Sequence, residues 1–432
     1  MNAKTLYALV AAATVAVVAA IWISSANRPV IEGSAQGRLL LPGLRDQVNN
    51  VDSIALSGAG DKVLVTLKRG ADGWHIVEKS SYPADLAKLR EFLLKLADAT
   101  VLEEKTANPK HYADLGVDDI AGKDAKGVQV AIGGLKQSLK FILGLYNGAG
   151  GGGTFVRRDG EAQSLLASGN LLAEKSPAGW LKHDLVDIDS GRIKEVVLTN
   201  LEGKVLRVAK TQSADANFQV ADVPKGRELA SDYVANSLGS GLANLRIDDV
   251  ATAHDLAAPD KAYKVHYLAF GGTVVDVTAW DADGKNALQL VAANDPAQLD
   301  ADIVAGQAAA KAAYETAVAS AKLKVVEAKG DDAAIAKAEA DVARPPSMVD
   351  PAKDRSERLA AATKVIEDLN RTFAGWTFTV PAYAFANFNK SMDDLLKPIA
   401  QKPAAGGKSP GLQPAGQTGR TPMVKPTPAP AH

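Results

Sequence analysis

The chain has 432 residues, and its 49 Lys and Arg against 50 Asp and Glu give a formal net charge of −1. A nucleic-acid-binding protein normally carries a clear basic excess, so this balance argues against a nucleic-acid partner. Hydrophobic residues make up 47% and charged residues 23%, which excludes a wholly disordered chain. Cysteine is absent, which excludes disulfides, thiolate nucleophiles, iron–sulfur clusters and Cys-ligated zinc.

The first feature along the chain is an uncharged apolar run, Thr5–Ile23. A helix of this length spans roughly 28 Å, close to the hydrocarbon thickness of a bilayer. Because Lys4 precedes the run, the positive-inside rule places the N-terminus in the cytoplasm and the rest of the chain outside. A signal peptide cleaved near Ser24-Ser25-Ala26 is the alternative, but the run is longer than a typical signal-peptide core. We therefore expect an uncleaved transmembrane signal-anchor over residues 1–26, and both interpretations export the body of the protein.

After a tether over residues 27–47, the chain repeats itself. The segment Val51–Lys68 aligns with Ile193–Lys210 at a constant offset of 142 residues. Both segments alternate apolar and polar residues around a Gly-containing turn, a pattern typical of a β-hairpin with one buried face. Five of the 18 aligned positions are identical: Leu56/Leu198, Lys62/Lys204, Val63/Val205, Leu64/Leu206 and Lys68/Lys210. We predict that Leu56 and Leu64 point into a core, as do Leu198 and Leu206.

The correspondence continues in the same order. An amphipathic helix is predicted after each hairpin, because apolar residues recur at steps of three and four over Leu86–Leu96 and again over Tyr233–Leu245. Two further strands are predicted in each copy: Val128–Gly134 and Leu139–Leu145 in the first, Val265–Gly272 and Val274–Ala279 in the second. The predicted fold class is α+β, a tandem duplication of a mainly antiparallel sheet-plus-helix module. Module 1 covers residues 48–189, and module 2 covers residues 190–295 and closes with residues 372–397.

Residues 296–371 interrupt module 2 and have a different composition, with 18 alanines between Ala297 and Ala343. Helical spacing, a break at Gly330-Asp331-Asp332 and a new start at Asp350-Pro351 predict an Ala-rich helical hairpin. We expect its two apolar seams to pack on each other as a projecting arm, so that its removal leaves both modules folded. The seams are Tyr314, Val318 and Val325 on one side and Leu359, Ile366 and Leu369 on the other.

The sheet of module 2 is expected to resume at Gly375–Val380, in the place that Gly153–Val156 takes in module 1. The last segment, residues 398–432, holds eight prolines and four basic but no acidic residues, which predicts a disordered tail.

Motifs that could carry chemistry are weak. Gly148-x-Gly150-x-x-Gly153 matches a dinucleotide fingerprint, but the expected strand after it favours a hairpin loop over a nucleotide site. Gly407-Lys408-Ser409 and Gly407-x-Ser409-x-Gly411 lie in the proline-rich tail, which offers neither a P-loop nor a nucleophile elbow. The six histidines show no metal-binding spacing. They are His75, His111, His183, His254, His266 and His432.

Two residue classes leave alternatives open. Adjacent acidic pairs are expected in turns and caps, although separate loops could assemble a glycosidase pair; they are Asp118-Asp119, Asp248-Asp249, Asp331-Asp332 and Asp393-Asp394. Trp74, Trp180 and Trp376 each follow a glycine near a strand, which favours core packing, with a glycan-stacking platform as the alternative. The sequence therefore indicates no catalytic, cofactor-binding or metal-binding residue.

Two motifs carry a resemblance. They are I-x-L-S…K-V…L-K-R-x-x-x-G-W-H-I at Ile54–Ile76 and L-x-x-x-x-x-x-G-W-L-K-H-D-L-V-D-I-D at Leu172–Asp189. With the anchor and the helix after the first motif, they resemble a bacterial family of exported domains of unknown function. Its members have one N-terminal membrane helix and are often encoded beside gliding-motility-type ABC transporter components. The resemblance covers Val51 to Ala293, resumes near Gly375 and implies no catalytic residues.

The expected function follows from the anchor and this resemblance. We expect a single-pass inner-membrane protein, held by residues 5–23, whose bulk is periplasmic and which acts as a non-enzymatic accessory protein of an ABC-transporter-like envelope complex. Its expected partners are membrane or periplasmic proteins such as a permease, with no nucleic acid, nucleotide or cofactor. The alternatives are a module that binds envelope glycan or peptidoglycan and, second, an envelope hydrolase.

Overall fold

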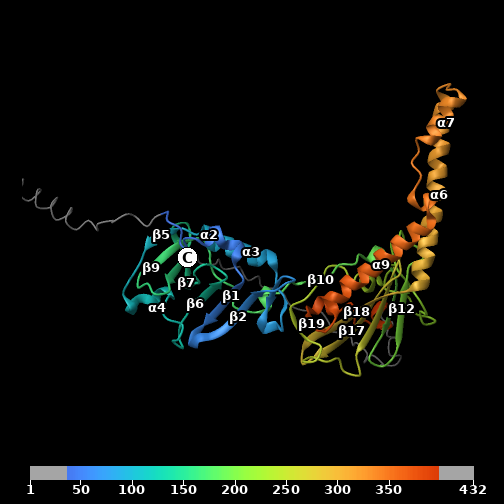
Figure 1. Cartoon of the computed structure of the whole chain (residues 1–432). Helices are drawn as coiled ribbons and strands as arrows, with labels where there is room; N and C mark the ends of the chain where they lie inside the picture. The colour runs from blue at the N-terminus through green and yellow to red at the C-terminus, as the bar shows by residue number, and fades with distance from the viewer. Residues whose placement is uncertain (1–36, 398–432) are drawn as a thin grey trace, which may run out of the picture.

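The computed structural model describes residues 37–397 and contains two large antiparallel sheets with helices packed against them (Figure 1). This confirms the predicted mixture of helices with mainly antiparallel sheets. The predicted anchor at residues 5–23 and the predicted tail at residues 398–432 lie outside the described residues. Within residues 37–397, no helix is both long enough and apolar enough to cross a bilayer.

The first sheet has nine strands in the order β4-β3-β2-β1-β6-β7-β8-β9-β5, and every neighbouring pair is antiparallel. Its strands are β1 (Ser53–Gly58), β2 (Lys62–Arg69), β3 (Trp74–Ile76), β4 (Tyr82–Pro83), β5 (Val101–Glu104), β6 (Val128–Gly133), β7 (Leu139–Asn147), β8 (Gly153–Arg158) and β9 (Ser164–Ser168).

The second sheet has eight strands in the order β13-β12-β11-β16-β17-β18-β19-β15, also antiparallel throughout. Its strands are β11 (Ile193–Thr199), β12 (Val205–Ala209), β13 (Gln219–Val220), β15 (Asp249–Thr252), β16 (Tyr263–Ala269), β17 (Thr273–Ala282), β18 (Lys285–Asn294) and β19 (Trp376–Val380). A separate antiparallel pair joins β10 (Asp184–Val186), which precedes the second sheet in the chain, to β14 (Leu245–Arg246), which lies between β13 and β15.

The two sheets have the same topology. From β3 to β5 the first sheet reads β3-β2-β1-β6-β7-β8-β9-β5, and the second reads β13-β12-β11-β16-β17-β18-β19-β15. The resumed strand β19 therefore takes the place of β9, and β18 takes the place of β8. The predicted match of Gly375–Val380 with Gly153–Val156 is wrong, because β18 adds a strand before the insertion that the prediction left out.

The paired hairpins also differ in register by one residue. Leu56 pairs with Val65 in the first hairpin, whereas Leu198 pairs with Leu206 in the second. A β-bulge in the first hairpin leaves Leu64 as an extra residue, and a slip of one residue turns each following side chain to the other face. Val65 is thus the buried equivalent of Leu206, while Leu64 is only half-buried. The constant offset of 142 holds for the first strand and, in the second strand, as far as Val63, which pairs with Ser57 as Val205 pairs with Thr199. It is wrong from Leu64 onward, where the offset becomes 141.

The helix predicted after each hairpin forms fully only in module 1. There α3 (Leu86–Asp98) begins at the N-cap Asp85 and buries Leu89, Phe92, Leu93, Leu96 and Ala97. In module 2 the segment forms turns and one short helix, α5 (Asn236–Gly239). Gly239 and Gly241 explain the difference, because glycine costs about 1 kcal/mol against alanine within a helix. A Cβ at Gly239 would also come within 2.2 Å of the Phe218 ring.

The insertion forms four helices: α6 (Pro296–Glu327), α7 (Asp332–Ala340), α8 (Pro346–Val349) and α9 (Pro351–Phe373). The end of α6 projects with α7 beyond the second sheet, and α9 lies along that sheet (Figure 1). Helix α6 contacts α7 and α8 and, through Gln307 and Asp354, also α9, whereas Ile366 and Leu369 of α9 pack on the core of the sheets. The prediction that the two seams pack on each other is therefore wrong for Ile366 and Leu369.

One asparagine explains why α9 stays with the sheet. Beyond residue 288, β18 has no pairing to β19, so its edge would expose unpaired backbone groups. The Asn370 side chain accepts a hydrogen bond from the Ala292 N–H and donates one to the Ala292 carbonyl, both at 2.8 Å. This amide pairs with β18 as the next strand would.

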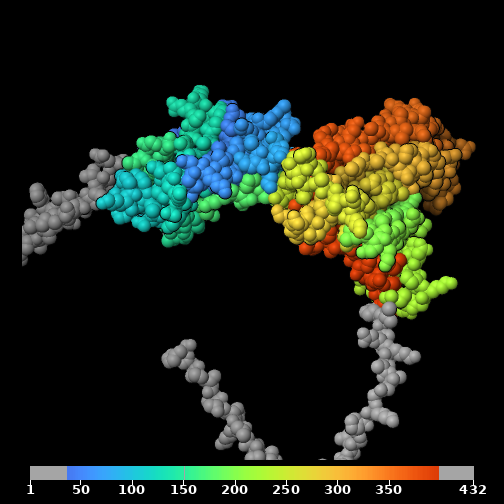
Figure 2. Space-filling model, turned by 90° about the horizontal axis from the view of Figure 1, so that it is seen from below, coloured from blue at the N-terminus to red at the C-terminus, as the bar shows by residue number. Residues whose placement is uncertain are grey.

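The two modules meet edge to edge through a narrow contact (Figure 2). The ring of Tyr82 in β4 packs edge-on against Trp376 and Phe378 of β19, with centroid separations of 5.1 and 6.3 Å. Lys79 forms an ion pair with Asp249 of β15, and the Ile247 N–H donates to the His183 carbonyl at 2.9 Å. One apolar core runs through both modules as a result.

The remaining short helices are α2 (Leu44–Gln47), α4 (Tyr112–Leu115), α10 (Ala382–Phe385) and α11 (Met392–Leu395).

Candidate functional site

A surface groove of about 540 Å³ lies in module 1, and we call it the Trp74 groove. Three parts of the chain line it: the segment before β1, the turn between β2 and β3, and one side of α3. Its lining residues are Val48, Asn49, Val51, Arg69, Gly73, Trp74, Leu86, Leu89, Arg90, Leu93 and Leu94. The groove has an apolar floor, and its cations come from two separate elements.

The turn between β2 and β3 places Arg69 and Trp74 together. They are directly opposite each other in the antiparallel pair, so their side chains lie on the same face of the sheet. The turn closes with a 2.6 Å hydrogen bond from the Gly70 N–H to the Gly73 carbonyl, and Gly73 has a φ of 139° that favours glycine. The Arg69 Nη1 donates to the Asn49 carbonyl at 2.9 Å, which fixes this guanidinium at the groove wall.

Helical spacing places Arg90 on the opposite wall. Leu86, Arg90 and Leu94 follow one another at steps of four along α3, so they form a single row. Leu89 and Leu93 are buried behind them, while Leu86 is 44% and Leu94 53% exposed. Among residues 37–397, neither Arg69 nor Arg90 forms an ion pair. The groove therefore offers apolar area and two cations without a matching acid.

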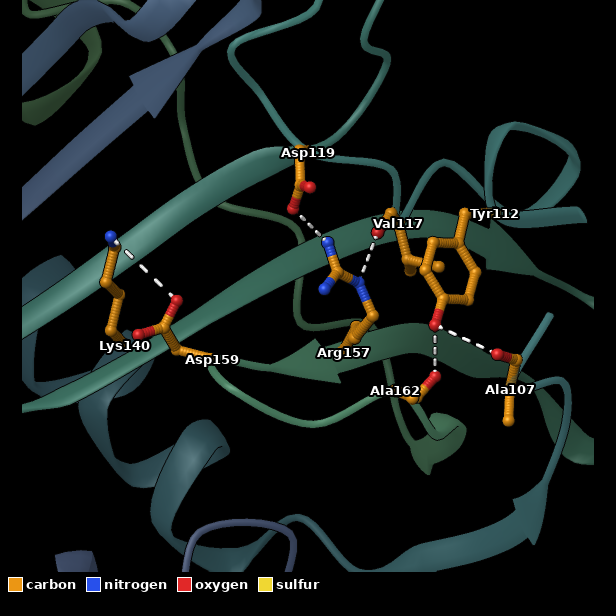
Figure 3. A network of polar contacts seen from close by, with 8 residues as sticks. All are labelled: Ala107, Tyr112, Val117, Asp119, Lys140, Arg157, Asp159 and Ala162. Carbon is orange, nitrogen blue, oxygen red and sulfur yellow. Dashed lines mark hydrogen bonds and ion pairs between the residues drawn. The ribbon is translucent and has the colours of Figure 1, made fainter. Parts of the chain in front are cut away.

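A second polar cluster surrounds Arg157 of β8 (Figure 3). Its guanidinium donates to the Val117 carbonyl at 2.7 Å, pairs with Asp119 and lies 4.8 Å from the ring centroid of Tyr112. The Tyr112 hydroxyl in turn donates to the carbonyls of Ala107 and Ala162. The bonds are all made within the chain, so the cluster fastens the segment from residue 107 to residue 119 onto the sheet.

The three tryptophans have different surroundings. Trp180 is 1% exposed, packs edge-on against Phe92 and donates its indole N–H to the Glu174 carbonyl at 2.8 Å. Because Trp180 is buried, neither face of its ring is open to a sugar, and the prediction of core packing is confirmed at this position. Trp376 packs against Tyr82 at the contact between modules. Trp74 is half-buried and lines the groove, which makes it the tryptophan best placed to meet a ligand.

The acidic pairs serve local structure. Asp119 binds Arg157, and Asp249 binds Lys79 at the contact between modules. Asp331 caps α7, and Asp394 completes a capping box at α11 with Ser391, whose hydrogen bonds hold the pKa of Asp394 below its usual range. The predicted cap role is confirmed for Asp331 and Asp394. It is wrong for Asp249, which lies in strand β15 and forms an ion pair. The four pairs lie on separate elements.

The histidines also make local contacts. His75 bonds the Asp72 carboxylate and the Ser81 carbonyl, each at 2.8 Å, and this contact with His75 lowers the pKa of Asp72. His183 bonds the Ile247 carbonyl at 2.7 Å, and His266 bonds Asp276 at 2.7 Å. His111 and His254 contact Asp114 and Asp255. Within residues 37–397, no three His, Asp or Glu side chains come together as a metal site.

The dinucleotide-like string lies in a loop between two strands. Gly148–Gly152 connects β7 to β8, and the residues from Gly153 onward form β8, where the fingerprint requires a helix. The other two glycine strings, which contain Ser409, lie outside the described residues, as does His432.

The sequence pattern singled out Trp74 but missed Arg69 and Arg90. The spacing of Leu86, Arg90 and Leu94, an apolar pair around a cation on one face of a helix, could have indicated the groove.

Comparison with known proteins gives one match. Residues 74–264 match the model of a family described as a domain of unknown function, DUF4340. The matched region begins at β3 in the first sheet and ends within β16 in the second, so it includes parts of both modules and the Trp74 side of the groove. No curated protein and no solved structure matches the chain. The resemblance to a family of domains of unknown function is confirmed to this extent.

Proposed function

We propose that the protein is a non-enzymatic, membrane-anchored accessory protein of an ABC-transporter-like envelope complex of the gliding-motility type. In this proposal residues 5–23 hold it in the bacterial inner membrane and both modules lie in the periplasm. The apolar run behind Lys4 supports the location, and the motifs around Trp74 and Trp180 support the family context.

The observation that carries the proposal is the arm formed by α7 and the distal part of α6. It projects beyond the second sheet (Figure 1), and it exposes large apolar side chains near its tip. Leu323 is 59% and Val326 is 56% exposed. Such side chains at the end of a projecting helix suit contact with another protein better than they suit solvent.

Co-purification tests the proposal. The full chain, tagged at its C-terminus, is purified from membranes of its native host, and permease subunits are quantified by mass spectrometry. The matched variant lacks residues 309–349 and joins the ends with a short Gly/Ser linker. This deletion keeps Gln307, whose side chain donates to the Pro351 carbonyl at 3.0 Å, so the base of the insertion is retained. We expect permease subunits with the full chain and far fewer with the variant.

The same preparation tests the alternative of glycan binding. Retention of the purified chain on peptidoglycan sacculi, lost on Trp74→Ala, would favour the glycan module and contradict the proposal if no permease subunit is recovered. Equal recovery of permease subunits with and without residues 309–349 would show that the arm is not the contact.

A further inference from the structure

We infer that the Trp74 groove is a docking site for an acidic, apolar segment of a partner protein, bound as a helix along α3. This inference concerns module 1 and is independent of the arm and of the membrane location proposed above. It rests on the composition of the groove walls, on their charge and on the exposure of their rim.

Charge determines the chemistry of the occupant. The groove brings together Arg69 and Arg90, and no Asp or Glu is among its lining residues. Arginine side chains on both walls of an apolar groove match a carboxylate that lies between apolar side chains. The C-terminal segment of the chain is the wrong occupant, because residues 398–432 carry Lys402, Lys408, Arg420 and Lys425 and no acidic residue.

Exposure determines the size of the occupant. A small molecule seated in the groove would leave the outward sides of Leu86 and Leu94 in water, because both lie on the rim. A helix laid along α3 covers them together with Trp74. Tryptophan and arginine are also the residues most enriched where binding energy concentrates in protein interfaces. The row Leu86–Arg90–Leu94 then faces a partner row of apolar, acidic and apolar residues at similar helical steps.

A displayed library tests this inference. The probe is a library of single helical peptides with one randomised face, selected against the full-length chain held in nanodiscs of neutral lipid, which avoid detergent in the groove. Selected peptides are then labelled with fluorescein, and their affinities are measured by anisotropy for the wild type and for Arg90→Glu, which removes a cation without breaking an ion pair of the described residues. Lys123→Glu is the matched control, since it makes the same charge change at an exposed lysine that does not line the groove and forms no ion pair among the described residues.

We expect the selected peptides to combine leucine or phenylalanine with aspartate or glutamate. Their affinity should fall by about tenfold or more on Arg90→Glu, and replacing the acidic residue of the peptide with lysine should restore binding to that variant. Trp74→Ala should weaken binding, whereas Lys123→Glu should leave the affinity within about twofold.

Three outcomes would overturn the inference. The first is a selection that yields no peptide whose affinity depends on both Arg90 and its own acidic residue. The second is competition by vesicles of phosphatidylglycerol but not of phosphatidylcholine, with loss of lipid binding on Arg90→Glu, which would assign the groove to an anionic lipid. The third is a self-associated wild type in sedimentation velocity that Arg90→Glu converts to monomer, which would assign the groove to a second copy of the chain.

Discussion

Two deletions within residues 296–371 should have opposite effects on module 2. Removing only residues 309–349 should leave the module folded, because the cut separates the arm from the sheet. Removing residues 296–371 should unfold the module, because it also takes the base of α6 and nearly all of α9. The expectation from sequence was that the longer deletion is tolerated, and the packing of α9 gives the reason to expect otherwise.

The buried side chains that the longer deletion removes set the magnitude. Leu299 and Ile303 of α6 are buried, and burying such a side chain contributes about 1.5–3 kcal/mol. Ile366 and Leu369 are half-buried against the core and contribute about half as much each. The two hydrogen bonds of Asn370 add about 1 kcal/mol each. The total is roughly 6–11 kcal/mol, comparable with the whole stability of a typical domain, about 5–15 kcal/mol.

Limited proteolysis with mass spectrometry measures the outcome. We expect the full chain and the variant without residues 309–349 to give the same protected fragment over the second sheet, and the variant without residues 296–371 to be cleaved within it. Tryptophan fluorescence in urea provides a second measurement, since Trp280 and Trp376 both lie in module 2. A longer deletion with the same protected fragment and the same urea midpoint as the shorter one would refute the assignment of α9 to the core.

Three further outcomes are expected. Leu206→Ala should cost about 2–5 kcal/mol of unfolding free energy, and Leu64→Ala about 1 kcal/mol, because Leu206 is buried and Leu64 is the half-buried extra residue of a bulge; equal losses in urea titrations would contradict the register. Burial raises the pKa of Tyr82 from 10.0 to about 12, so the unfolded chain loses this proton first and stability should fall as the pH rises from about 10 to about 12; Tyr82→Phe should lessen that fall in urea midpoints measured across this range. A reporter fused after residue 60 should be active only outside the cytoplasm, and activity of a cytoplasm-only reporter there would contradict the predicted anchor.

The regular parts of the fold could be predicted from the sequence, and the irregular parts could not. Alternating apolar residues correctly located the hairpins β1–β2 and β11–β12, because one buried face imposes a period of two. The bulge at Leu64 was not predicted. Leu64 and Leu206 are identical at the constant offset of 142 residues, and this identity suggested the same orientation for two side chains that point to different faces of their sheets. In module 2, apolar spacing predicted a helix that Gly239 and Gly241 prevent, although Leu238, Leu242 and Leu245 remain buried as predicted.

The candidate site depended on residues far apart in the sequence. Trp74 stood out because it follows a glycine after a strand, but nothing in the local pattern joins Arg69 to Arg90. The pairing of β2 with β3 and the packing of α3 bring them to one groove. From sequence alone, an arginine on a helix is expected to face solvent. Only its apolar neighbours on the same row, Leu86 and Leu94, indicate that Arg90 belongs to a groove.

The insertion explains how module 2 is completed without a long helix of its own. Module 1 packs α3, a helix of 13 residues, into its core, whereas the matching segment of module 2 yields only the single turn α5. The second sheet instead receives α9, a helix of 23 residues from the insertion, which packs on β18 and pairs with its open edge through Asn370. The insertion thus has two parts with separate physical roles. Its base and α9 stabilise the sheet, while α7 and the distal part of α6 project beyond it and expose Leu323 and Val326, the side chains on which the proposed partner contact rests.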